Sequence, residues 1–426
     1  MDLLKFGSRG PRVQFLQLAL NRAGFGPVQT DGIFGYATQS AVLRFQTELD
    51  LQPDGIVGAI TRQALRPWYE GYTTHRIRRG DSLYTIARTH HTTVRRIETA
   101  NPGLDPFHLP IGKVLTVPLA FPVVPTTISW TGELLETVLR GLKARYPFLE
   151  TGCIGQTVLG QDIPYLVLGE GRNTVLYTAA HHANEWITAP LLMQFSEDVL
   201  QGYMNDQKLQ DTQLSEFWQN NRVYIVPMVN PDGVDLVTGA LQQGQAYETA
   251  RAIAADFPDI PFPGGWKANL AGTDLNLQYP ADWEQAKVIK FAQGFDRPAP
   301  RDYVGTGPLT APESRALYEF TRSVNPELVL AYHTQGEVIY WKYLNFDPPE
   351  GRRIAYQFAA LSGYTVEETP YASGFAGYKD WFIQEENKPG YTIEVGLGEN
   401  PLPISEFDEI YRRNLGILLL AARVHT

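Results

Sequence analysis

The chain has 426 residues, a formal net charge of −10 and 43% apolar residues. This length exceeds a typical single domain and predicts two or three domains, each with enough apolar residues for a core. The negative charge argues against nucleic acid as a partner, because such proteins neutralise phosphates with Lys and Arg. The single cysteine, Cys153, excludes an intramolecular disulfide. No apolar run reaches 18 residues, so we expect no membrane span and no membrane partner.

Residues 1–69 are expected to form a small helical domain with apolar residues at helical spacing. Two copies of the pattern D-G-I-x-G-x-x-T begin at Asp31 and Asp54, and each leads into a helix for which Thr38 or Thr61 is the expected N-cap. A generic helical bundle with turn glycines is the plainer interpretation. The stretch resembles the three-helix peptidoglycan-binding domain of cell-wall hydrolases, on Leu16, Asp31, Gly32, Phe34, Gly35, Thr38, Ala41, Val42, Phe45 and Gln46.

Residues 73–119 are expected to form a second small domain in the order strand, helix, helix, strand. The motif G-D-S-L-x-x-I-A begins at Gly80, where Asp81 or Ser82 caps a helix, and a returning strand follows over residues 111–118. These motifs resemble the LysM domain, which binds glycans that contain N-acetylglucosamine. Two wall-binding modules in tandem imply avidity. The alternative is that they only pack against the rest of the chain or mediate assembly.

Residues 120–127 contain prolines and indicate a linker, and residues 128–426 indicate one large α/β domain. After a helix over 134–142, short apolar runs alternate with helical patterns, which predicts a sheet with helices on both faces. In such sheets the functional site lies beyond the carboxyl ends of the strands. The predicted strands are 163–168, 174–180, 222–229, 328–332 and 391–395, and predicted helices include 189–200 and 313–323.

Residue types that bind metals follow several of these strands. His182 and Glu185 come directly after one strand, but an isolated H-x-x-E pattern more often marks a core histidine and a surface charge. Other strands deliver His333, Glu394 and the polar turn 230–233. Because buried, unpaired imidazoles and carboxylates are costly, such a cluster indicates a metal or catalytic site. Zinc is bound by imidazole and carboxylate ligands about 2 Å away and keeps an open position in catalytic sites.

The large domain resembles the zinc carboxypeptidase family of the carboxypeptidase A type. The resemblance implies an α/β fold with a mixed, eight-stranded-type sheet sandwiched by helices. It also implies one zinc ion with His182, Glu185 and His333 as ligands. The motifs that carry it are H-x-x-E-W at 182–186, N-P-D-G at 230–233, D-x-N at 274–276, the strand-end His333, and D-W at 380–381 before Glu394.

By the same resemblance, Glu394 is the general base that deprotonates the attacking water and later protonates the leaving amine. The family places an arginine before D-x-N to stabilise the oxyanion, and Lys267 stands there instead, as a point charge without a bidentate fork. Asn276 is the expected substrate-binding residue. Tyr371 best matches the family's mobile tyrosine, with Tyr378 as its rival. In the plainer interpretations Glu394 is an ion-pair partner and Lys267 a surface lysine.

Two departures from the family pattern concern the substrate. Members that trim protein C-termini carry an arginine directly after D-x-N, which clamps the terminal carboxylate, but this chain has Leu277 there. Asn184 also stands where those members carry a substrate-contacting arginine. Recognition of an ordinary C-terminus therefore requires another cation, and Arg297, Arg301 and Arg315 are the candidates.

Zinc-hydrolase motifs together with two wall-binding modules resemble the γ-D-glutamyl-L-diamino acid endopeptidase I family of spore-forming bacteria. That resemblance implies hydrolysis of the bond between γ-D-glutamate and meso-diaminopimelate or lysine in peptidoglycan stem peptides. The implied partners are those peptides and N-acetylglucosamine-containing glycan. The alternatives are a metallocarboxypeptidase acting on ordinary peptides, a non-catalytic wall-binding protein, and a zinc deacylase of small amides.

The N-terminal residues show no basic segment followed by a long apolar core, so we expect no secretory signal. This also resembles the endopeptidase family, whose members act on spore wall material without Sec export. The expected location is the bacterial cell wall or spore-associated wall material, after synthesis in the cytoplasm of the mother cell or forespore.

Overall fold

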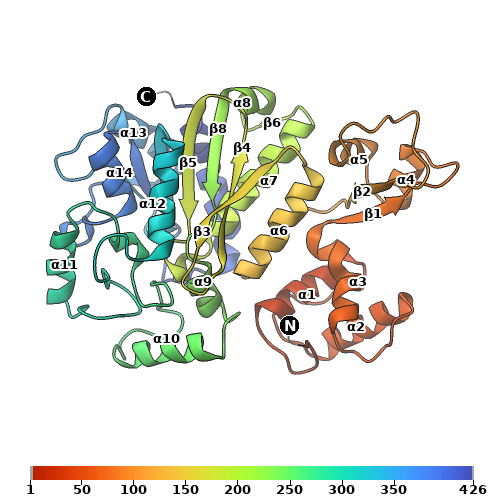
Figure 1. The fold of residues 1–426 in the computed structure, drawn as a ribbon, viewed down its shortest axis with the longest axis horizontal. Helices are drawn as coiled ribbons and strands as arrows, with labels where there is room; N and C mark the ends of the chain where they lie inside the picture. The colour runs from red at the N-terminus through yellow and green to blue at the C-terminus, as the bar shows by residue number, and fades with distance from the viewer. Residues whose placement is uncertain (1–2, 425–426) are drawn as a thin grey trace. The chain divides into compact units, whose positions relative to one another are not determined.

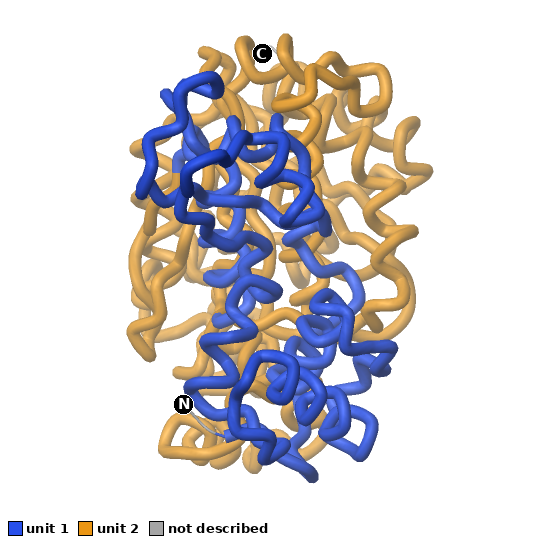
Figure 2. Tube along the Cα trace, turned by 90° about the vertical axis from the view of Figure 1, so that its right-hand side faces the viewer, with its two compact units in different colours: residues 1–129, 133–150 blue, residues 130–132, 151–426 orange. Residues whose placement is uncertain are grey.

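A computed structural model describes residues 3–424 of the chain. Figure 2 colours its two compact units: the described residues up to 129 together with 133–150, and residues 130–132 together with 151 onward. The helix α6 (Gly132–Arg145), which the sequence placed with the large domain, thus clusters mainly with the first unit. Within the described part of the chain, no helix is long and apolar enough to cross a membrane.

The first unit begins with three helices, α1 (Pro11–Arg22), α2 (Tyr36–Glu48) and α3 (Ala59–Glu70), around an apolar core. The N-caps of α2 and α3 are Gly35 and Gly58, so the prediction that Thr38 and Thr61 cap these helices was wrong. Both threonines lie one turn inside their helices and are buried. A side-chain amide, that of Gln17 or of Gln46, donates to each threonine hydroxyl at 3.1 Å and also binds the aspartate of the same repeat.

The next part of this unit has the predicted order of strand, two helices and strand. The strands β1 (Tyr72–Arg76) and β2 (Val114–Pro118) pair antiparallel. The helices between them are α4 (Leu83–Thr89) and α5 (Val94–Ala100). Of the two candidate caps, Ser82 caps α4, because its hydroxyl accepts from the Thr85 amide while the Thr85 hydroxyl accepts from the Ser82 amide.

The second unit is built on an eight-stranded mixed sheet in the order β11-β10-β12-β9-β5-β8-β4-β3, which confirms the predicted fold class. The four central strands are parallel, and β10 and β4 run antiparallel to their neighbours β12 and β8. The bounds are β3 (Glu150–Gln156), β4 (Asp162–Leu168), β5 (Asn173–Ala179), β8 (Asn221–Val226), β9 (Leu328–Thr334), β10 (Val338–Tyr340), β11 (Thr365–Glu367) and β12 (Gly390–Val395).

Helices cover both faces of this sheet, as the alternation of side chains along β5 shows. Leu176 belongs to a core cluster with residues of α12 (Pro312–Val324) and α14 (Tyr378–Glu386). Its neighbour Tyr177 packs instead on Phe195 of α7 (Thr188–Met204), and its hydroxyl donates to the Leu418 carbonyl of α15 (Phe407–Ala421). The strands accordingly lie between helices in Figure 1.

The remaining elements connect the strands of the second unit. The short 3-10 turns η1 (Ala183–Glu185) and η2 (Leu275–Leu277) carry two of the predicted motifs. The other elements are β6 (Lys208–Leu209), β7 (Thr212–Gln213), α8 (Leu214–Asn220), α9 (Pro231–Thr238), α10 (Gln245–Ala255), α11 (Trp283–Ala292), α13 (Gly351–Ser362), η3 (Tyr371–Ser373) and η4 (Ile404–Glu406).

Candidate metal centre

The loop after β5 turns sharply to present two polar side chains. Ala180, directly after the strand, has a φ of 48°, and its amide donates to the Thr188 hydroxyl at 3.0 Å. That hydroxyl donates in turn to the Glu185 carbonyl at 2.7 Å. This connection folds the turn η1 back over the strand end. It places His182, the N-cap residue of η1, and Glu185 on the same side of the loop.

The polar turn 230–233 holds this loop in place. The Asn230 side chain donates to the carbonyls of His181 and Ala268, and its oxygen accepts from the Gly233 amide at the start of α9. Asn230 is fully buried. The N-P-D-G motif therefore serves the architecture of the site and fastens the His181 and Ala268 segments to one another.

His333 and Glu394 come from neighbouring parallel strands. His333 lies near the end of β9, and Glu394 is its direct register partner in β12. Because β5 pairs with the other edge of β9, the loop after β5 and these two strand ends meet at the carboxyl edge of the sheet. The structure thus brings together the four residues that the sequence placed at strand ends.

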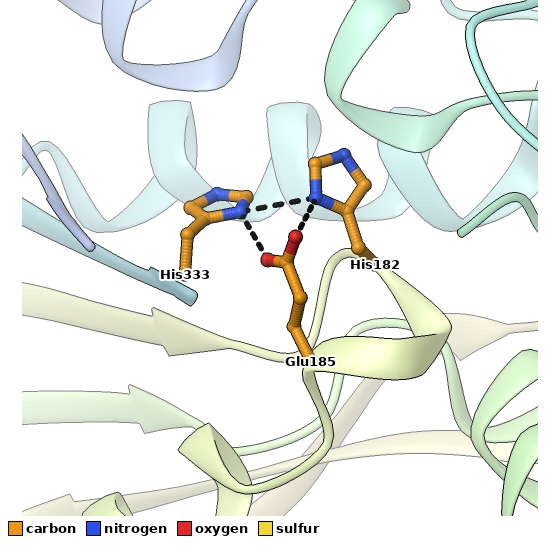
Figure 3. A group of neighbouring side chains, drawn as sticks. All are labelled: His182, Glu185 and His333. Carbon is orange, nitrogen blue, oxygen red and sulfur yellow. Dashed lines mark hydrogen bonds and ion pairs between the residues drawn. The ribbon is translucent and has the colours of Figure 1, made fainter. Parts of the chain in front are cut away.

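Three of these side chains direct their donor atoms at one point (Figure 3). The Nδ1 atoms of His182 and His333 lie 3.2 Å apart, and each lies 2.9 Å from a carboxylate oxygen of Glu185. Donors about 2.05 Å from a tetrahedral zinc ion lie about 3.3 Å from one another. The spacing and the chemistry of the three donors therefore fit a zinc ion.

Asp274 fixes how His182 presents its ring. Its Oδ1 lies 3.1 Å from His182 Nε2, and its Oδ2 accepts from the Asp302 amide at 3.1 Å. An acceptor on Nε2 keeps the proton there and leaves the Nδ1 lone pair for a metal. Sequence reasoning cited the D-x-N motif but singled out only its asparagine. The signal for Asp274 was available, since a metal-ligating histidine generally donates its other N–H to an acceptor.

Glu394 lines a cavity of about 230 Å³ beside these donors. In the part of the chain that the structure describes, its carboxyl group has no hydrogen-bond partner, unlike the carboxylate of Glu185. Burial, followed by the charge of Glu185, raises the pKa of Glu394 to about 8. A divalent cation next to it would favour the carboxylate form and lower this pKa. The group is thus placed to exchange a proton near neutral pH.

Lys267 contributes a positive charge to the same cavity. Its Nζ lies 2.7 Å from Glu185 Oε1, and its side chain is largely buried. Burial alone would lower the pKa of Lys267, but the neighbouring carboxylates, Glu185 above all and then Glu394, raise it above its ordinary value, so the ammonium form persists. Lys267 is therefore part of the charged cavity and is not a surface lysine.

The other predicted residues differ in their surroundings. Asn276 lines the cavity, and its side-chain oxygen accepts from the Tyr378 amide at 3.0 Å. The Tyr378 ring is fully buried and its hydroxyl contacts Thr321, so it cannot swing without opening the core. Tyr371 is 66% exposed in the turn η3 and lies in an adjoining hollow.

The residues that mark departures from the family also have defined places. Asn184 is buried, and its amide donates to the Gly264 carbonyl. Leu277 packs in a small apolar cluster with Trp283 and Phe375, at the edge of the cavity. Lys290 and Lys379 were not predicted as site residues, and Arg301 was only one of three candidate arginines. Lys290, Lys379 and Arg301 all line the cavity, but no local sequence pattern identifies them as site residues.

Three known families match successive stretches of the chain. A peptidoglycan binding domain matches residues 9–65, a LysM domain matches 75–118, and zinc carboxypeptidase matches 135–416. Gamma-D-glutamyl-L-diamino acid endopeptidase 1 of Lysinibacillus sphaericus is 44% identical over 287 residues, which cover 67% of this chain and 70% of that protein. The protein YqgT of Bacillus subtilis (strain 168) is 36% identical over 283 residues, covering 66% and 73% respectively.

Among solved structures, bovine thrombin-activatable fibrinolysis inhibitor in complex with tick carboxypeptidase inhibitor superimposes with a TM-score of 0.54. The match covers 69% of this chain and 96% of that chain at 18% sequence identity. At this identity the likeness shows a shared fold and nothing of the substrate. It agrees with the mixed sheet and its two helical layers.

Proposed function

We propose that this chain, which belongs to the zinc carboxypeptidase family, hydrolyses the amide bond between γ-D-glutamate and the diamino acid of peptidoglycan stem peptides. The observation that carries the chemistry is the convergence of His182, Glu185 and His333 beside Glu394. The substrate class rests on the name of the 44% identical relative and on the matches to two wall-binding modules. The diamino acid is meso-diaminopimelate or lysine.

In this proposal the two N-terminal modules hold the chain on N-acetylglucosamine-containing glycan, and the bacterial cell wall or spore-associated wall material is its place of action. One zinc ion bound by His182 Nδ1, His333 Nδ1 and Glu185 would supply a Lewis acid that polarises the scissile carbonyl and acidifies water. Asp274 keeps the His182 ring in the tautomer that this binding requires.

The remaining roles belong to side chains that touch the substrate. Glu394 removes a proton from the attacking water and delivers it to the leaving amine nitrogen. The Lys267 ammonium donates to the oxygen that becomes negative as the carbonyl is attacked. Asn276 holds the substrate through its side-chain nitrogen, since its oxygen is occupied by the Tyr378 amide. Tyr371, exposed in its turn, is the residue that moves over bound substrate.

The role of Lys267 predicts a specific kinetic loss. Lys267→Met removes the donor to the oxyanion, so kcat should fall by about 10²- to 10³-fold while KM changes little. Lys267→Arg should recover part of this loss, because it keeps a cation at the site. Steady-state kinetics on a stem peptide measure both effects, with zinc content determined in parallel since Lys267 contacts Glu185. Unchanged kcat in a zinc-replete Lys267→Met variant contradicts the assignment.

The substrate assignment is tested with two peptides and the zinc-loaded protein. One is L-Ala-γ-D-Glu-meso-diaminopimelate and the other is a dipeptide with a C-terminal aromatic residue. We expect release of free diaminopimelate from the first and no cleavage of the second, because only the first contains the γ-D-glutamyl bond that the proposed function requires. Cleavage of the second alone identifies a general metallocarboxypeptidase and refutes the proposal.

A further inference from the structure

Among the residues that the structure describes, four cationic side chains line the cavity that holds Glu394, and they differ in the contacts that each makes with a carboxylate. Three are lysines with largely buried side chains, and each ammonium contacts a carboxylate of the protein. These pairs are Lys267 with Glu185, Lys290 with Asp302 at 2.6 Å, and Lys379 with Asp380.

Arg301 is the exception. Its side chain is 43% exposed, and only its Nε is engaged, with Asp302 Oδ2 at 2.6 Å. Among residues 3–424, its two terminal nitrogens make no hydrogen bond. Asp302 also contacts Lys290, so one carboxylate is shared by two cations. A guanidinium edge with two free nitrogens matches the geometry of a carboxylate.

The backbone fixes Arg301 next to the groups that act on the scissile carbonyl. The preceding carbonyl, that of Pro300, accepts from the amides of Lys267 and Ala268 at 2.8 and 2.9 Å. The following amide, that of Asp302, donates to Asp274. Arg301 thus lies between two anchors in the part of the cavity that Lys267 and Asp274 form. Of the three arginines offered by the sequence, only Arg301 lines this cavity among the described residues.

We propose that Arg301 binds the free α-carboxylate of the γ-linked D-glutamyl residue, on the acyl side of the scissile bond; this rests on the proposed function. Lys267 donates to the carbonyl oxygen of that same residue, and only the α-carbon and two methylene groups separate this carbonyl from the α-carboxylate. An α-linked residue other than glutamate has no carboxylate at this distance from its carbonyl. The contact therefore selects an acyl residue with a free carboxylate three carbons from the scissile carbonyl, as γ-linked glutamate has, and compensates in affinity for the missing arginine at Leu277.

The experiment measures affinity without turnover, in the Glu394→Gln background, by calorimetry. Three ligands are compared: L-Ala-γ-D-Glu-L-Lys, its analogue with a carboxamide in place of the D-glutamyl α-carboxylate, and its analogue with a carboxamide at the C-terminal lysine. Each is titrated into zinc-loaded protein with Arg301 intact, Arg301→Met or Arg301→Lys. Arg297→Met is the matched control, because Arg297 belongs to the same segment, is exposed, and pairs with Asp256 and Asp296.

We expect Arg301→Met to weaken binding of the first peptide by about 10- to 100-fold, the range of a charge-assisted hydrogen-bonded pair. The acyl-side carboxamide should bind about equally to the protein with Arg301 and to Arg301→Met. Arg301→Lys should lie between, and Arg297→Met should have no effect. In protein that keeps Arg301, the acyl-side carboxamide should bind more weakly than the acid by most of the same factor. This comparison of two ligands tests the contact without any Arg301 variant.

The proposal is overturned if the acyl-side carboxamide binds to Arg301-containing protein as tightly as the acid. It is also overturned if the effect of Arg301→Met disappears with the C-terminal carboxamide instead, because Arg301 then binds the leaving-side carboxylate. Failure of the wild-type protein to cleave any of the three peptides counts against the proposed function. Cleavage without dependence of affinity on the acyl-side carboxylate counts against Arg301 alone.

Discussion

Glu394→Gln is expected to lower kcat on a stem peptide by about 10²- to 10⁴-fold, the usual contribution of a general acid–base group. Glutamine has the same shape but cannot accept the proton of the attacking water. Glu394 makes no hydrogen bond within residues 3–424 and is not among the three converging donors, so zinc content should not change. Steady-state kinetics and metal analysis on the same preparation measure the two quantities together.

The matched control is Glu399→Gln, an exposed glutamate in the same C-terminal segment, which should leave kcat unchanged. If Glu394→Gln keeps its zinc and retains activity within a factor of ten of wild type, the proton is moved by another group. The assignment of Glu394 would then be wrong, even though its register position beside His333 remains.

His333→Ala is expected to remove both metal and activity. The change deletes one of three donor atoms, leaving His182 and Glu185. Loss of a residue that only supports a ligand weakens metal binding by about 10- to 100-fold, so loss of a ligand should exceed 100-fold. Zinc affinity, measured by competition with a chelator of known strength, should fall accordingly, and hydrolysis should become undetectable.

The control for this variant is His108→Ala, because His108 is exposed and lies in the first unit. Comparison with Glu394→Gln distinguishes a general base from a metal ligand. Glu394→Gln should keep zinc and lose turnover, whereas His333→Ala should lose both. If His333→Ala binds zinc as tightly as wild type, the three-donor site is not the zinc site. Circular dichroism distinguishes loss of the ligand from loss of the fold, since His333 is buried.

The parts of the site that sequence could predict are those carried by strands. The segments that form β5, β9 and β12 are short, apolar and rich in β-branched residues, a pattern that predicts buried strands. Parallel strands bring their carboxyl ends to one edge, which is why His182, His333 and Glu394 could be expected near one another. The eight-stranded mixed sheet followed from the resemblance and is confirmed.

The parts that sequence could not predict depend on loops that meet across long stretches of chain. Asp274 reaches His182 across 92 positions, and Arg301 reaches the cavity through loop hydrogen bonds that leave no periodic signal. The prediction that Thr38 and Thr61 cap their helices was wrong, because the hydroxyl of each accepts a hydrogen bond from a glutamine of another helix. The sequence also does not show that Tyr371 is exposed in a turn while Tyr378 is buried in the core, and this difference is what favours Tyr371 as the mobile tyrosine.

The proposed reaction of this zinc peptidase is hydrolysis of the γ-D-glutamyl–diamino acid bond of the cell wall. The most direct measurement is to digest purified peptidoglycan with the zinc-loaded chain, label new amino groups, and determine the fragment masses. We expect new amino groups only on the α-nitrogen of the diamino acid, with L-Ala-γ-D-Glu remaining on the glycan. Stepwise release of single C-terminal residues, with the γ-D-glutamyl bond intact, would contradict the proposed reaction.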